Sequence, residues 1–102
     1  PALISDPDHE LWKAQFSGAP GLLSIELRSC DEAAYARFVE SLRLFGLGAS
    51  WGGFESLVLP AIPLARRGLE PQPDEGRLVR LHIGLEDPDD LVADLRQGLA
   101  QL

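Results

Sequence analysis

The chain has 102 residues, of which 45% are hydrophobic and 25% charged, and its formal net charge at pH 7 is −7. Such a length forms one domain at most. The acidic excess argues against nucleic acid as a partner, and no apolar run is long enough to span a bilayer. The start of the chain lacks the basic and apolar parts of a signal peptide. Together with the lone Cys30, which excludes an internal disulfide, this favours a reducing compartment, and we expect the cytoplasm.

Residues 1–20 are predicted to form a leader segment or interdomain helix ahead of the domain proper, which covers residues 21–102. Within the leader, residues 8–16 are expected to form a short helix with Leu11, Trp12 and Phe16 as apolar anchors.

The first predicted strand and helix of the domain follow directly. Residues 22–28 alternate in polarity and predict a strand with Leu23, Ile25 and Leu27 toward the core. Residues 29–32 have the spacing of a capping box and start a helix that is expected to end at Gly46. Its apolar positions recur at helical intervals: Tyr35, Phe38, Val39, Leu42 and Phe45.

Two shorter pieces are predicted in the middle of the chain. Residues 47–51 are expected to form a second strand, which Gly52 and Gly53 interrupt, and residues 54–59 continue as a strand or a short helical turn. Residues 60–77 contain four prolines and two glycines and predict a loop.

The clearest pattern in the sequence spans residues 77–90. Val79, Leu81 and Ile83 alternate with Arg80 and His82, which predicts a strand with one apolar and one polar face. Asp87 and Pro88 then have the residue types of a helix N-cap and first helical position. The helix is expected to run to residue 102 with a buried stripe of leucines. These are Leu91, Leu95, Leu99 and Leu102.

These elements predict an α+β fold, in which two helices cover one face of a small antiparallel or mixed sheet. The uncovered face is the expected location of any binding chemistry. Its predicted residues are polar: Ser24, Glu26, Ser50, Arg80 and His82.

Arg80 is the leading candidate binding residue, because a mid-strand arginine is costly to desolvate without an anionic partner. One interpretation is a structural ion pair with Glu26 or Glu55. The other is a planar, bidentate fork for a substrate carboxylate.

The segment from Ser50 to Gly53 is the second candidate. Its glycines permit a backbone nest for an anion, or only a tight turn. If the strands pair, Ser50 would stand beside Arg80. Trp51 would be a pocket wall or a core anchor, and by itself it is expected to be a core anchor.

The remaining reactive side chains are expected to have no catalytic role. His82 shares the face of Arg80 but is expected to be structural. His9 is expected at the surface, Cys30 is expected to be inert, and no cluster of Cys and His predicts a metal site.

Residues 50–57 and 80–87, read together, resemble motifs of the pyridoxal-phosphate-dependent enzymes of cysteine and methionine metabolism. The resemblance runs essentially end to end, through residues 9–13 and 89–95, and concerns the C-terminal small domain. Trp51 before the two glycines is similar to the cystathionine β-lyase branch.

The resemblance implies the C-terminal domain of a fold-type-I enzyme, usually a homotetramer, whose large domain is outside this chain. It implies that Arg80 pairs with the substrate α-carboxylate, with Ser50 and Trp51 as neighbouring contacts. The implied reaction cleaves cystathionine to homocysteine, pyruvate and ammonia. Pyridoxal 5′-phosphate would be bound by the large domain, so no catalytic or cofactor-binding residue is expected here, and this chain alone is expected to be inactive.

Two alternatives remain open at this point. One is a γ-synthase or γ-lyase type of enzyme, which would use the same carboxylate clamp. The other is a free-standing module that binds an amino acid or dimerises through its polar sheet face.

Overall fold

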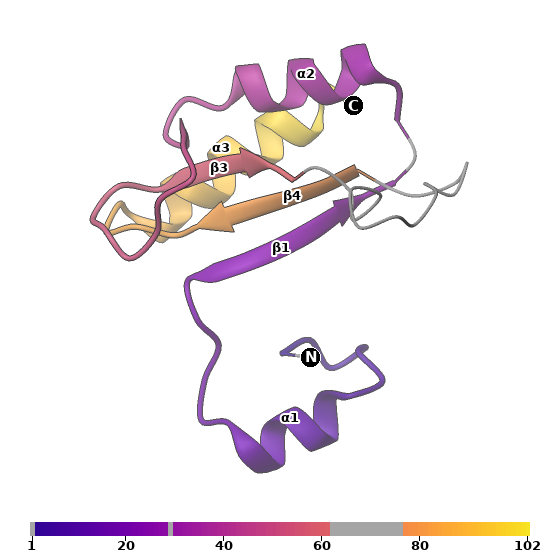
Figure 1. Cartoon of the computed structure of the whole chain (residues 1–102), viewed down its shortest axis with the longest axis vertical. Coiled ribbons are helices and arrows are strands. Elements are labelled where there is room, and N and C mark those ends of the chain that lie inside the picture. The colour runs from indigo at the N-terminus through magenta and orange to yellow at the C-terminus, as the bar shows by residue number, and fades with distance from the viewer. Residues whose placement is uncertain (1, 29, 62–76) are drawn as a thin grey trace.

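The computed structural model describes residues 2–28, 30–61 and 77–102 (Figure 1). Three helices and four strands alternate along the described chain. In order they are α1 (His9–Gln15), β1 (Leu22–Leu27), α2 (Glu32–Ser41), β2 (Gly46–Leu47), β3 (Leu57–Pro60), β4 (Arg77–His82) and α3 (Pro88–Leu99). No helix within these residues is long and apolar enough to cross a membrane.

The four strands form one mixed sheet in the order β1-β4-β3-β2. β4 lies at its centre, antiparallel to β1, with Ser24 opposite Arg80, and antiparallel to β3, with Leu59 opposite Arg80. The short β2 pairs in parallel with β3. The α+β fold with a small mixed sheet is therefore confirmed, and the strand with the clearest alternation, β4, is one of the two inner strands.

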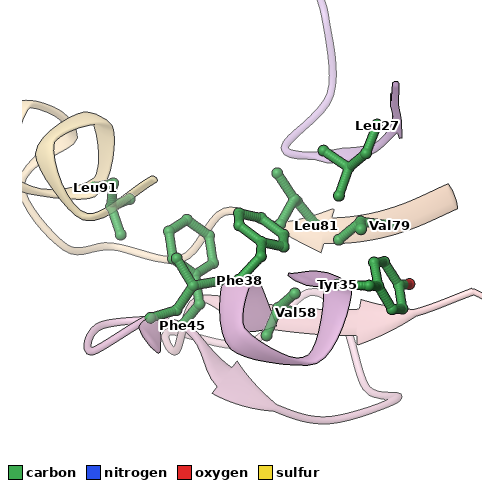
Figure 2. Packing of buried hydrophobic residues seen from close by; sticks show 9 residues of the cluster. Leu27, Tyr35, Phe38, Phe45, Val58, Val79, Leu81 and Leu91 are labelled. Carbon is green, nitrogen blue, oxygen red and sulfur yellow. The ribbon is translucent and has the colours of Figure 1, made fainter. Parts of the chain in front are cut away.

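Helices α2 and α3 lie on the same side of the sheet (Figure 1) and enclose the core with it. Phe38 of α2 is completely buried against Val79 and Leu81 of β4 and Val58 of β3 (Figure 2). Burial of a side chain such as Phe38 contributes about 1.5–3 kcal/mol. The predicted apolar face of β4 is confirmed, and this fixes Arg80 on the opposite face.

Helix α2 ends at Ser41, not at Gly46 as predicted. Leu42 is already extended, with ψ 135°. The next two N–H groups, of Arg43 and Leu44, donate to the Asp94 carboxylate of α3 at distances of 2.8–3.0 Å. A tertiary acceptor thus replaces the next helical turn. The predicted capping box is also wrong in its position, because the cap is Asp31, which accepts from the Ala34 N–H at 2.7 Å.

The predicted strands in the middle of the chain are too long. The strand expected over residues 47–51 is reduced to Gly46–Leu47, and the one expected over 54–59 starts only at Leu57. The segment between them is held by side-chain hydrogen bonds from β4 and the residues after it. Most of the predicted loop over residues 60–77 lies outside the described residues, and its ends, Pro60 and Arg77, belong to strands.

Some predicted core positions are exposed. Leu23 shares its face with Leu27 but lies at the uncovered end of the edge strand β1 and is exposed. In α3 Leu91 is buried and Leu95 packs on the core, whereas Leu99 is 42% exposed and Leu102 lies beyond the helix. The buried stripe continues instead through Asp94 and Gly98. A Cβ on Gly98 would come within 2.8 Å of a methyl group of Leu42, so a larger residue here would require the Leu42 side chain to shift.

The short helix predicted in residues 8–16 is present as α1, but it contains no buried residue. Leu11 and Phe16, predicted to be apolar anchors, are exposed, and α1 lies apart from the sheet (Figure 1). The division into a leader and a domain stays a prediction.

Candidate functional site

The candidate site is built around Arg80, which projects from β4 on the face that α2 and α3 leave uncovered. Its Nη2 donates to the Ala49 carbonyl and lies 3.4 Å from the Ser50 carbonyl oxygen. The predicted proximity of Arg80 and Ser50 is confirmed, although the contact is the Ser50 backbone oxygen and Ser50 lies outside the strands. A guanidinium has five N–H donors. Both of these contacts within the described residues are made by Nη2.

Trp51 lies at the surface with 65% of its area exposed, so its prediction as a core anchor is wrong. It follows Ser50 in the connection between β2 and β3, where no helix of the described chain covers it. It is instead a wall of an open pocket of about 490 Å³. The pocket is lined by Pro20, Gly21, Leu22, Trp51, Gly52, Gly53, His82 and Ile83. The alternative interpretation, a pocket wall, is the one that matches this geometry, although Arg80 is not among the lining residues.

Gly52 has a φ of +79°, which non-glycine residues rarely adopt. Its N–H donates to Nε2 of His82 at 3.1 Å. Of the two interpretations of this segment, an anion nest or a tight turn, the contact favours the turn, because the Gly52 N–H already has an acceptor within the chain. His82 is buried, with a relative exposure of 7%, which agrees with the expectation that it is structural.

A second cluster, which sequence reasoning missed, binds the other end of the connection between β2 and β3, at Ser56. Glu86 accepts from the Ser56 N–H at 2.8 Å and from the Ser56 hydroxyl at 2.7 Å. That hydroxyl oxygen also accepts from the Gly84 N–H at 2.9 Å. The Ser56 hydroxyl and N–H hold the pKa of the Glu86 carboxyl below its ordinary value. The sequence contained no periodicity that would pair Ser56 with Glu86, since both lie outside regular elements.

The β2–β3 connection thus lies beside the C-terminal end of β4 (Figure 1) and is attached at three points to β4 and the residues after it. Arg80 binds its first residues, His82 its middle and Glu86 its last. Segments far apart in the sequence therefore converge, and a guanidinium, an exposed indole and a pocket meet on one face. Such a surface suits a small molecule with an anionic end.

The other reactive residues stay outside this site. His9 stacks on Trp12 in α1, with ring centroids 5.6 Å apart. Cys30 is a free thiol, half-buried beside the core. Lys13, the chain's sole lysine, lies in the last turn of α1. No group of three or more acidic, His or Cys side chains within the described residues is arranged to hold a metal ion.

The chain belongs to the family described as Cys/Met metabolism PLP-dependent enzymes, whose model matches residues 1–100. Its structural neighbours are fold-type-I enzymes of this kind, and the match is to their C-terminal region. Full-length members are enzymes that depend on pyridoxal phosphate.

Individual relatives differ in the reaction their names state. The chain is 52% identical over 101 residues to cystathionine β-lyase of Bordetella avium, covering 97% of this chain and 25% of that protein. It is 44% identical over 109 residues to an L-alanine/L-glutamate racemase of Wolbachia pipientis, covering 100% of this chain and 26% of that protein. The structure matches cystathionine γ-synthase of Xanthomonas oryzae, solved with aminoacrylate and cysteine, at a TM-score of 0.78 and 36% identity. This match covers 99% of the present chain and 27% of that one, so the chain spans about a quarter of the length of these relatives.

The residues present fit part of such an enzyme's site and not its cofactor site. Lys13 lies on a helix with no buried residue, and the pocket beside Trp51 is open on one side. The arginine and the adjacent segment fit a carboxylate instead.

Proposed function

We propose that this chain supplies the carboxylate-binding side of the active site of a pyridoxal-phosphate-dependent carbon–sulfur lyase. The substrate would be cystathionine, cleaved to homocysteine, pyruvate and ammonia. The observation that carries the proposal is the position of Arg80, on the open face of β4 in contact with Ala49 and Ser50, the two residues before Trp51. The similarity to cystathionine β-lyases over the whole chain supports it.

Arg80 would bind the substrate α-carboxylate through parallel N–H···O bonds, which a planar guanidinium makes better than an ammonium. The Ala49 and Ser50 carbonyls accept from Nη2 and orient the fork before substrate arrives. Trp51 would border the substrate and exclude water from one side of the pocket. The cofactor, bound by the larger remainder of the enzyme, would supply the electron sink.

The choice of the β-lyase reaction depends on the relatives and on Trp51. A γ-synthase and a racemase are also similar to this chain over nearly its whole length. A carboxylate-binding arginine by itself is therefore compatible with several reactions. Incubation of the full-length enzyme with cystathionine distinguishes them by product. Release of pyruvate supports the proposal, whereas 2-oxobutyrate or a racemised amino acid as the main product contradicts it.

The role of Arg80 is tested by Arg80→Ala in the full-length enzyme. A hydrogen bond to a charged group contributes about 1.5–3 kcal/mol, so we expect KM for cystathionine to rise about 10- to 100-fold. Arg80→Lys should recover only part of the loss, because lysine cannot bind a carboxylate bidentately.

Arg77→Ala is the matched control. Arg77 belongs to the same strand but faces the helices, where it pairs with Glu32 at 2.7 Å and lies over the Tyr35 ring. This variant should leave KM unchanged. An Arg80→Ala enzyme with the KM of the wild type would refute the proposed role.

A further inference from the structure

We propose that His82 is a positioning residue, which fixes the backbone on the C-terminal side of Trp51 and so keeps Trp51 against the substrate pocket. The inference rests on the proposed function of Arg80 and adds to it a second strand residue that acts through the loop. His82 would not touch the reacting atoms.

Two successive outward-facing residues of β4, Arg80 and His82, contact the backbone on opposite sides of Trp51, and this geometry supports the role. Arg80 binds the carbonyls of Ala49 and Ser50, on one side of Trp51. His82 binds the Gly52 N–H at 3.1 Å, and its Nε2 lies 3.2 Å from the Gly53 carbonyl oxygen, on the other side. The backbone that carries Trp51 is therefore restrained before and after this residue by the same strand.

Within this chain, Trp51 has little packing of its own that would restrain it. The side chain is 65% exposed, so the burial that holds most indoles in one orientation is largely missing. Gly52 follows it with a φ of +79°, and a glycine has more conformations available than any other residue. A hydrogen bond to the Gly52 amide selects one of them.

The contacts of Nε2 hold for either neutral tautomer of His82. With the ring proton on Nδ1, Nε2 accepts from the Gly52 N–H at 3.1 Å, and with the proton on Nε2 it donates to the Gly53 carbonyl oxygen at 3.2 Å. Nδ1 is buried and has no hydrogen-bond partner in the part of the chain that the structure describes. The ring thus makes its described polar contacts through Nε2 alone, and all of them go to the segment after Trp51. A role for His82 in that segment follows from this one-sided set of contacts.

The test uses two substitutions in the full-length enzyme. His82→Leu keeps an apolar side chain of similar bulk but removes the acceptor, whereas His82→Gln places a carbonyl oxygen near the position of Nε2. Three quantities are measured: KM and kcat with cystathionine, and the deuterium exchange rate of the Gly52 amide by mass spectrometry. His82→Leu should raise KM about tenfold and accelerate Gly52 exchange at least as much, and His82→Gln should restore both to within about threefold of the wild type.

Asp94→Asn is the control for a purely structural effect. Asp94 is a buried polar residue on the helix side of the sheet, and its loss should lower the melting temperature without changing KM or Gly52 exchange. If His82→Leu lowers the melting temperature as Asp94→Asn does but leaves KM unchanged, His82 is structural only and the inference is wrong. Unchanged Gly52 exchange would also overturn it. Failure of the proposed function is distinguishable, because Arg80→Ala would then have no effect on KM.

Discussion

Neighbouring residues of β4 point to opposite faces of the sheet. Arg77 and Arg80 belong to one short strand, yet Arg77 binds Glu32 of α2 and Arg80 binds the segment before Trp51. The reason is the alternation of side chains along a strand, which places odd-numbered residues of β4 toward the helices and even-numbered ones away from them. Strand parity therefore decides which arginine can meet a ligand.

Gly84 shows how closely the site is packed behind its exposed surface. A Cβ at this position would overlap the Phe54 carbonyl oxygen and would lie 2.6 Å from Oε2 of Glu86. We expect Gly84→Ala to lower the free energy of unfolding by about 1–3 kcal/mol, the usual cost of overpacking. Urea unfolding of the 102-residue chain measures this change.

Gly18→Ala is the matched control for that measurement, because a Cβ there would have no neighbour within 4 Å. Its free energy of unfolding should stay within about 0.5 kcal/mol of the wild type. Equal stability of the two variants would show that the Phe54–Gly84 contact is not as close as described.

At the scale of secondary-structure elements, a buried carboxylate joins the end of α2 to α3. Asp94 accepts from the N–H groups of Arg43 and Leu44 and from the Gln97 side chain, at distances of 2.8–3.0 Å. Burial by itself raises the pKa of Asp94, but the N–H donors from Leu44 and Arg43 outweigh burial and hold the pKa below its ordinary value of 3.8.

This lowered pKa predicts a pH-dependent stability. A carboxyl whose pKa is lower in the folded than in the unfolded chain stabilises the fold above the unfolded pKa, and this contribution is lost as pH falls through the folded pKa. At pH 7, Asp94→Asn should therefore lower the free energy of unfolding by about 1–3 kcal/mol. The difference between wild type and variant should shrink below about pH 4, the unfolded pKa of an aspartate. Urea unfolding at pH 7 and pH 3 measures it, and a difference independent of pH would contradict the assigned role.

The start of α3 provides a second test at this scale. Asp87 accepts from the N–H groups of Asp89 and Asp90 at 2.9 and 3.4 Å, and Pro88 occupies the first turn without an N–H to satisfy. Asp87→Ala should lower the free energy of unfolding by about 0.5–2 kcal/mol through loss of the cap. Asp87→Ser, which keeps an acceptor, should recover most of it. A loss of equal size in both variants would indicate that charge, and not capping, is responsible.

At the scale of the whole molecule, the proposal concerns an enzyme that is longer than this chain. It spans about a quarter of the length of its relatives, and its pocket beside Trp51 is open. The sole lysine lies on α1, which has no buried residue. These facts agree with the expectation that Arg80 faces a site completed by other parts of the enzyme. The predicted homotetramer stays a prediction.

We therefore expect the 102-residue chain, mixed with pyridoxal phosphate and cystathionine, to release no pyruvate and to leave the visible spectrum of the cofactor unchanged. Full-length cystathionine β-lyase of Bordetella avium in the same assay is the positive control. Pyruvate release by the chain itself would show that it holds a complete active site, contrary to the proposal.

The elements with regular periodicity could be predicted from the sequence. The alternation in residues 77–83 identified the central strand and the face of Arg80, and the Asp87–Pro88 pair located the start of α3. The α+β class followed from these patterns, because local alternation and capping depend on nearby residues alone. The resemblance to family motifs supplied the functional hypothesis.

The tertiary structure alone decided the surroundings of those residues. Asp94 ends α2 early, and Gly98 in place of Leu99 faces the neighbouring helix, because contacts between α2 and α3 override the periodicity of each helix. Trp51 is exposed because its segment is fastened to β4 by His82 and Arg80 and not by a core. Hydrogen bonds between segments some 30 residues apart in the chain, such as Ser56 with Glu86, have no local signature, so only the folded chain could reveal them.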